Sequence, residues 1–214
     1  MPLAKSPILQ LANCDRVGGV SLILGSLLLA VYALLFAALL PLGSPYHLLV
    51  VNPSWRPLAL TALVGVLLLI GGFYAAYQRM QATAGAIGAI GFAFVEVAYI
   101  FQACRLTWEL CIDPVIASHP ESVFLLRDMV IFSNPVVAAF RVVSLATIFI
   151  GTVLFTMTLY RSRAYPKAAA IFTGVGAIVY GIGPMVSVLL AIAGIVTFAI
   201  GCCLIGVRLL TVST

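Results

Sequence analysis

The stretch VGGVSLILGSLLLAVYALLFAALLPL, residues 17–42, contains no charged residue. Further apolar runs follow at 57–78, 82–105, 135–160, 167–182 and 185–208. A helix needs about 20 apolar residues to cross the hydrocarbon core of a bilayer. Every backbone N–H and C=O in lipid also needs a partner within its own segment. The runs therefore predict membrane-spanning helices.

The composition of the whole chain supports the same prediction. It is 64% hydrophobic and 8% charged, with a mean hydropathy of +1.22, whereas soluble domains carry about 25% charged residues. A compact soluble fold could not bury so much apolar surface. The six runs together with their connecting loops use nearly the whole chain. We therefore predict an all-α, polytopic bundle of six spans that forms a single integral membrane domain, residues 1–214.

The basic residues predict the orientation of the spans. Because Lys and Arg are enriched on the cytoplasmic side of membrane proteins, the more basic side is expected inside. One side carries Lys5, Arg16, Arg79, Arg161, Arg163, Lys167 and Arg208. The other side carries Arg56, Arg105 and Arg127. We predict a bacterial inner-membrane protein with both termini cytoplasmic and the long loop 106–134 extracytoplasmic.

The long loop is expected to carry structure of its own. Ser118, His119, Pro120 and Glu121 have the spacing of a capping box, in which Ser and Glu satisfy the first amides of a helix. Apolar residues then recur at helical spacing, at Val123, Leu126, Val130 and Ile131. This pattern predicts a short amphipathic helix in the outer interface. The loop could be a folded lid without a ligand, or an element that docks a partner or covers a site.

Two charged residues, Glu96 and Arg141, lie well inside the apolar runs, whereas the others lie at or outside the ends of the runs. The positions of Glu96 and Arg141 in the third and fourth helices put them about 12 Å and 9 Å below the outer ends. Because a lone charge in hydrocarbon is costly, the two are predicted to pair. Tyr99 and Ser144 are the predicted supporting polar residues. The pair could fix the register of the two helices, or Glu96 could be a proton or cation site with Arg141 as its regulator.

Glycines are grouped within three of the runs. They are Gly85, Gly88 and Gly91, then Gly174 and Gly176, and then Gly194 and Gly201. Small residues let helix backbones approach closely in a membrane. This grouping indicates tight packing within the chain, or alternatively a seam between copies or partners.

The cysteines allow one disulfide on the outer side, between Cys104 and Cys111. A continuous helix through both would hold them about 10.5 Å apart along its axis, which is too far for a bridge. The structure of this segment therefore decides between a disulfide and two separate thiols.

The sequence lacks the residues that several kinds of cofactor binding and catalysis require. Neither His47 nor His119 lies in a span, so haem ligation by two histidines inside the bundle has no ligands. The chain has no Gly-x-Ser-x-Gly, no His-Glu-x-x-His and no phosphate-binding Gly-Lys motif. We expect no cofactor, no metal site and no catalytic residue. Nucleic-acid binding is not expected either, because no basic patch is interleaved with aromatic residues.

The span layout resembles uncharacterised bacterial six-helix membrane proteins of about this length. The residues that carry the resemblance are Arg16-Val17-Gly18-Gly19-Val20 and the link Arg161-Ser162-Arg163-Ala164-Tyr165-Pro166-Lys167 into Ala168-Ala169-Ala170. The resemblance implies a fold and no assigned activity.

Three classes of function fit these observations. The first is a non-catalytic accessory subunit that packs against protein partners or as a homo-oligomer, with membrane lipids around it. The second is a small transporter or channel that uses Glu96 and Arg141. The third is a membrane enzyme acting on a lipid-like substrate at the outer interface, where polar residues gather. These residues are Glu109, Asp113, His119 and Glu121.

Overall fold

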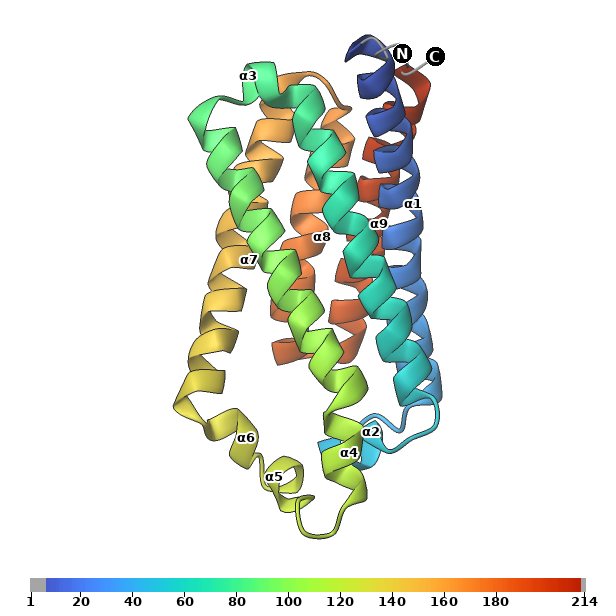
Figure 1. The fold of residues 1–214 in the computed structure, drawn as a ribbon, viewed down its shortest axis with the longest axis vertical. Helices are drawn as coiled ribbons and strands as arrows, with labels where there is room; N and C mark the ends of the chain where they lie inside the picture. The colour runs from blue at the N-terminus through green and yellow to red at the C-terminus, as the bar shows by residue number, and fades with distance from the viewer. Residues whose placement is uncertain (1–6, 213–214) are drawn as a thin grey trace, which may run out of the picture.

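The computed structural model describes residues 7–212, except for the side chains of residues 7–12, 184, 185 and 212. The described chain is all-α and contains no strand. Five long helices run along the molecule (Figure 1): α1 (Pro7–Leu39), α3 (Trp55–Cys111), α7 (Pro135–Ser162), α8 (Lys167–Val186) and α9 (Val188–Val212). Four short helices gather at one end: α2 (Tyr46–Val50), α4 (Asp113–Ser118), α5 (Phe124–Arg127) and α6 (Val130–Ser133).

Four described helical stretches are long and apolar enough to cross a membrane. They are Asn13–Leu39, Trp55–Ser118, Pro135–Ser162 and Val188–Thr211. A shorter apolar helix covers Lys167–Gly183. Their length and composition make the chain an integral membrane protein.

Helix α3 is folded back on itself at Gly85. The break was expected between residues 78 and 82, but helical structure continues to Gly85, whose φ is 59° and ψ is −168°. These angles belong to a region that only glycine adopts readily. The first arm (55–84) and the second arm (86–111) then lie side by side (Figure 1). Between the arms, the rings of Tyr77 and Phe92 stack with their centroids 4.3 Å apart.

The turn at Gly85 gives a first prediction. Gly85→Ala is expected to lower the free energy of unfolding by about 1–3 kcal/mol, because a Cβ atom is strained at this φ and ψ. Gly71→Ala is the matched control, since Gly71 lies in the regular first arm and a Cβ there meets no atom within 4 Å. Denaturant unfolding of both variants in detergent, followed by circular dichroism, measures the difference. Equal stability of the two variants would contradict the role given to Gly85.

The long helices form a ring. Helix α1 contacts α3, α3 contacts α7, α7 contacts α8, α8 contacts α9, and α9 returns to α1. The second arm of α3 and α8 face each other across the ring, and no backbone contact joins α3 to α8 within the described residues. The ring therefore surrounds an interior that side chains must fill.

Close approach at glycines holds this ring together. A Cβ atom on Gly65 would lie 2.9 Å from the carbonyl oxygen of Gly25, and one on Gly91 would lie 2.7 Å from the backbone nitrogen of Phe155. Backbone approaches of the same kind occur at Gly151, Gly176, Gly194 and Gly201, whereas Gly88 and Gly174 pack against the side chains of Thr158 and Thr156. The predicted packing role of glycines within the chain is confirmed at these positions. Gly85 is the exception, since it has open space around it and makes the turn instead.

The segment after α3 differs from its prediction. The predicted capping box is wrong, because Ser118 ends α4 and its hydroxyl donates to the Val115 carbonyl at 2.9 Å. The expected single helix is divided into α5 and α6, each four residues long. Met129 separates them with a left-handed φ of 59°. A left-handed residue interrupts the helical hydrogen-bond ladder, so one continuous amphipathic helix does not form.

The length of α3 decides whether Cys104 and Cys111 can form a disulfide. This helix continues through Cys111, and both Cys104 and Cys111 are free and exposed. The continuous helix keeps the two thiols apart.

Candidate binding cavity

A cavity lies inside the ring, and all the long helices contribute to its wall. The cavity has a volume of about 70 Å³. Its polar lining residues are Tyr32, Tyr99, Gln102, Arg105, Thr152 and Tyr180. The rest of the wall is aliphatic or aromatic and includes Leu29, Val66, Ile148, Ile195 and Phe198. An apolar pocket with a few convergent polar groups is the usual form of a small-molecule site.

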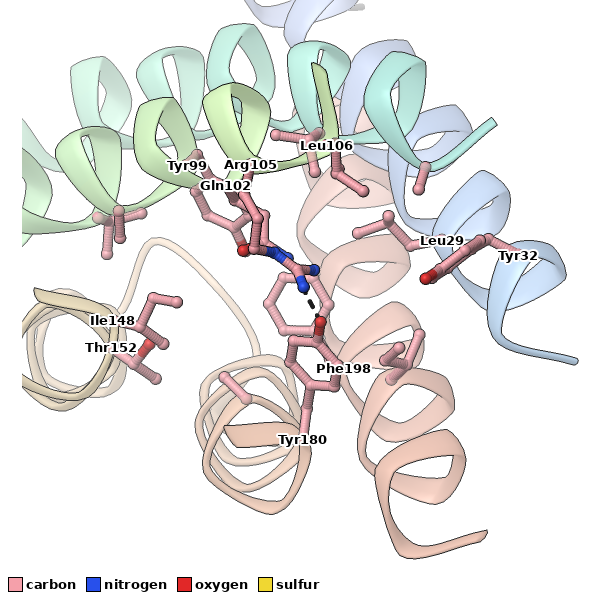
Figure 2. A pocket seen from close by; sticks show the side chains of 16 residues that line it. Leu29, Tyr32, Tyr99, Gln102, Arg105, Leu106, Ile148, Thr152, Tyr180 and Phe198 are labelled. Carbon is pink, nitrogen blue, oxygen red and sulfur yellow. Dashed lines mark hydrogen bonds between the residues drawn. The ribbon is translucent and has the colours of Figure 1, made fainter. Parts of the chain in front are cut away.

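The second arm of α3 supplies the main polar face. Tyr99, Gln102 and Arg105 are three residues apart, so they lie on one side of the helix. Figure 2 shows Tyr180 of α8 opposite them and Tyr32 of α1 reaching in from another side. The amide nitrogen Nε2 of Gln102 donates to the Tyr180 hydroxyl at 3.4 Å. This bond connects two helices whose backbones do not touch.

Among the described residues that line the cavity, Arg105 is the one that carries a full charge. Its Nη1 atom lies 2.8 Å from Oε1 of Glu109, and its side chain keeps 43% of its surface exposed. The guanidinium points into the cavity (Figure 2). A guanidinium has five N–H donors and no acceptor. The donors not used by Glu109 are available to a molecule in the cavity.

Phe73 packs against two lining residues of the cavity, Tyr99 and Phe198. Its side chain is 1% exposed, and its ring centroid lies 5.4 Å from those of Tyr99 and Phe155 and 6.2 Å from that of Phe198. Phe73 follows Val66 along the first arm toward the Gly85 turn, so these rings form a floor beneath the cavity. The cavity therefore occupies the half of the bundle nearer to the short helices.

Two hydrogen bonds, one from the start of α3 and one from α2, fix the chain around Glu109, the acidic partner of Arg105. Trp55 Nε1 donates to the backbone carbonyl of Glu109 at 2.8 Å, and the Tyr46 hydroxyl donates to Asp113 Oδ2 at 2.5 Å. Burial raises the pKa of Tyr46 well above its usual range, and the nearby carboxylates of Glu109 and Asp113 raise it further. Tyr46 therefore stays protonated and remains a donor. These contacts fix the end of α3 that carries Glu109.

The predicted Glu96–Arg141 ion pair is not formed. Oε1 of Glu96 is buried without a hydrogen-bond partner, whereas the exposed Arg141 guanidinium lies over the Phe132 ring, 5.6 Å from its centroid. The physical reason is the direction in which the Glu96 side chain leaves the second arm of α3. Helix α7 packs on the second arm at Val95, where a Cβ on Gly151 would approach the Val95 nitrogen to 2.7 Å. Glu96 is one residue on and points about 100° away.

The two supporting residues have different positions. Tyr99 lies in the cavity wall and stacks on Phe73. Ser144 is not in the wall, and its hydroxyl donates to the Phe140 carbonyl of its own helix at 2.7 Å. A Ser hydroxyl commonly satisfies itself in this way within a membrane helix.

Five polar residues of the cavity were not predicted as site residues: Tyr32, Gln102, Arg105, Thr152 and Tyr180. The spacing of Tyr99, Gln102 and Arg105 was a usable signal, because it places three polar side chains on one face of a span. Arg105 was assigned to the end of its helix instead. Tyr32 and Tyr180 carry no comparable pattern, since their convergence depends on how distant helices pack.

The acidic and histidine residues between positions 109 and 121 do not form one cluster. Asp113 is buried and Glu109 nearly so, whereas His119 and Glu121 are exposed. His119 Nδ1 lies 2.8 Å from the Val115 carbonyl oxygen. Within the described residues, no group of three His, Cys, Asp or Glu side chains is placed to hold a metal ion.

No family model and no curated protein matches the sequence, and no solved structure matches the fold. The functional argument therefore rests on the cavity itself.

Proposed function

We propose that this chain is a six-span membrane protein that binds a small amphipathic molecule in the cavity between its helices. The observation that carries the proposal is the composition of the cavity wall. Donor groups of Gln102, Arg105 and Tyr180 gather on the side of α3 and α8, and aliphatic side chains such as Val66 and Ile195 line other parts. A molecule with a polar end and an apolar body complements such a wall.

The lengths of the helices support six crossings. At about 1.5 Å per residue, each arm of α3 exceeds the roughly 30 Å thickness of the hydrocarbon core. Helix α8 has 20 residues, and at about 1.5 Å per residue these also reach across that core. The two arms and the four remaining long helices make six spans.

The charge distribution supports a cytoplasmic position for the termini. The Gly85 turn, the α7–α8 link and both described ends of the chain lie at one end of the bundle (Figure 1). The basic residues there include Arg16, Arg79, Arg161, Arg163 and Lys167. Because positive residues favour the cytoplasmic side, the cavity and the short helices are assigned to the outer half. The ligand would enter from the outer leaflet or the space outside it.

The aromatic floor favours a binding protein or carrier over an open channel. Phe73, Phe155 and Phe198 fill the ring below the cavity, so a permeant molecule would need these side chains to move. The accessory-subunit role stays a prediction and ranks second, because the cavity favours ligand binding by the chain itself. Comigration with a larger complex on a native gel would favour that second role.

A cavity-filling substitution tests the proposed function. Ala98→Phe is expected to remove small molecules that copurify with the wild-type protein, because Ala98 lines the cavity and is 4% exposed. Thr152→Phe fills the cavity from α7 and is also expected to remove the copurifying small molecules. Ala93→Phe is the matched control, since Ala93 lies on the exposed side of the same arm. Mass spectrometry of organic extracts from the purified, monodisperse proteins gives the readout.

The result of this experiment either supports or contradicts ligand binding in the cavity. A species bound to the wild type and Ala93→Phe, and absent from both cavity variants, supports ligand binding. The same species in equal amount on all four proteins, or no species on any of them, contradicts it.

A further inference from the structure

We propose that the cavity selects an uncharged amphiphile whose polar end accepts hydrogen bonds, such as a ketone-type carbonyl, and that Glu109 sets this selectivity. The inference rests on the proposed binding function and adds the chemical class of the ligand. It follows from the donors in the wall, the state of charge around Arg105, and the apolar remainder of the cavity.

The polar groups of the cavity wall are mainly hydrogen-bond donors. The cavity holds the guanidinium of Arg105, which can only donate, and the hydroxyl of Tyr180, which already accepts from Gln102 and so keeps its own hydrogen to donate. Tyr32 adds another hydroxyl. A ligand that brings acceptors satisfies these groups, whereas a ligand that brings only donors leaves Arg105 without a new partner. A carbonyl oxygen has two lone pairs and suits this arrangement.

The positive charge of Arg105 is balanced by a carboxylate of the protein. Glu109 lies 2.8 Å from Arg105, and its side chain is only 13% exposed. Arg105 is therefore already neutralised within the protein. A ligand carboxylate would bring a second negative charge beside Glu109, and like charges at this distance repel strongly away from bulk water. A neutral carbonyl accepts from the remaining N–H groups of Arg105 without that repulsion.

Glu109 is held too firmly to be displaced easily. The Trp55 indole fixes its backbone carbonyl, and Asp113, one helical turn further on, is fixed by Tyr46. Moving the Glu109 carboxylate away from Arg105 would leave a nearly buried charge without its partner, which is costly. The protein thus keeps its own acid next to Arg105, and the ligand must be neutral.

The experiment compares two ligands that differ in charge but have the same number of carbon atoms, 2-undecanone and undecanoate. Each is tritiated, and its equilibrium binding is measured to the full chain in phosphatidylcholine nanodiscs at about pH 9, where the carboxylic acid is ionised. Empty nanodiscs give the partition background. Wild type is expected to bind the ketone about 10-fold or more tightly than the carboxylate.

Glu109→Gln is the decisive variant, because it keeps the size of the side chain and removes its charge. It is expected to raise the affinity for undecanoate by about 10-fold or more, since Arg105 then lacks its counter-ion. Its affinity for the ketone should change by less than about 3-fold, because the donors of Arg105 remain in place. Glu121→Gln, at an exposed acid of the same loop, is the matched control and should change neither value.

Arg105→Gln provides a second route if Glu109→Gln fails to fold. It should weaken ketone binding by about 10-fold, because a charged donor is lost, and it should leave undecanoate binding weak. Equal binding of the two ligands to wild type, or an unchanged preference in Glu109→Gln, would overturn the selectivity while leaving ligand binding intact. No saturable binding of either ligand above the level of Ala98→Phe would overturn the proposed function as well.

Discussion

Phe73→Ala is expected to lower the free energy of unfolding by about 3–5 kcal/mol, the usual cost of truncating a large buried aromatic residue. Phe73 is 1% exposed and its ring contacts Tyr99, Phe155 and Phe198. Its side chain therefore packs against the second arm of α3, against α7 and against α9. Since lipid provides no hydrophobic drive between helices, lost packing is the main contribution to this change.

Phe172→Ala is the control for this prediction. It deletes the same atoms from α8, where Phe172 is 39% exposed, and surface substitutions usually change stability by less than about 0.5 kcal/mol. Unfolding in mixed micelles, followed by circular dichroism, gives both values. If the two variants lose the same stability, the aromatic floor does not hold the ring together.

Gly194→Leu is the second substitution with a large expected effect. A Cβ atom on Gly194 would lie 2.3 Å from the backbone nitrogen of Tyr180, so helices α8 and α9 would have to separate. Overpacking of this kind typically costs about 1–3 kcal/mol. Because Tyr180 lines the cavity and pairs with Gln102, the same shift should also weaken ligand binding.

Gly71→Leu is the matched control, since Gly71 is helical and a Cβ there meets no atom within 4 Å. Its stability is expected to stay within about 0.5 kcal/mol of wild type. Thermal unfolding in detergent and ketone binding in nanodiscs are measured on both variants. Full stability of Gly194→Leu would mean that α8 and α9 can separate without loss, contrary to the close packing at this glycine.

Much of the fold was predictable because its signals are local. The apolar run at 17–42 predicts a spanning helix by its length alone, and Pro135 marks the start of α7 correctly. The turn within α3 was placed too early, because the charge at Arg79 resembled a helix end. The true turn is at Gly85, and a single glycine inside a run that contains others carries no distinguishing signal.

The site was less predictable because it depends on neighbours. Depth along a helix can be counted from the sequence, and Glu96 and Arg141 were matched on that basis. Direction around the helix depends on which helices pack together. The second arm turns Val95 toward α7 and Arg105 toward the cavity, and Glu96 faces neither.

The sequence by itself determined an all-α membrane protein, because apolar runs of this length are stable as helices in lipid whatever surrounds them. It also determined that glycines would allow close packing. Only the tertiary structure decided that the helices close into a ring, that Phe73 packs among aromatic rings on one side of its interior, and that Arg105 enters the cavity beside Glu109. These features join residues far apart in the chain, and helix packing brings such residues together through contacts that no local pattern of sequence specifies.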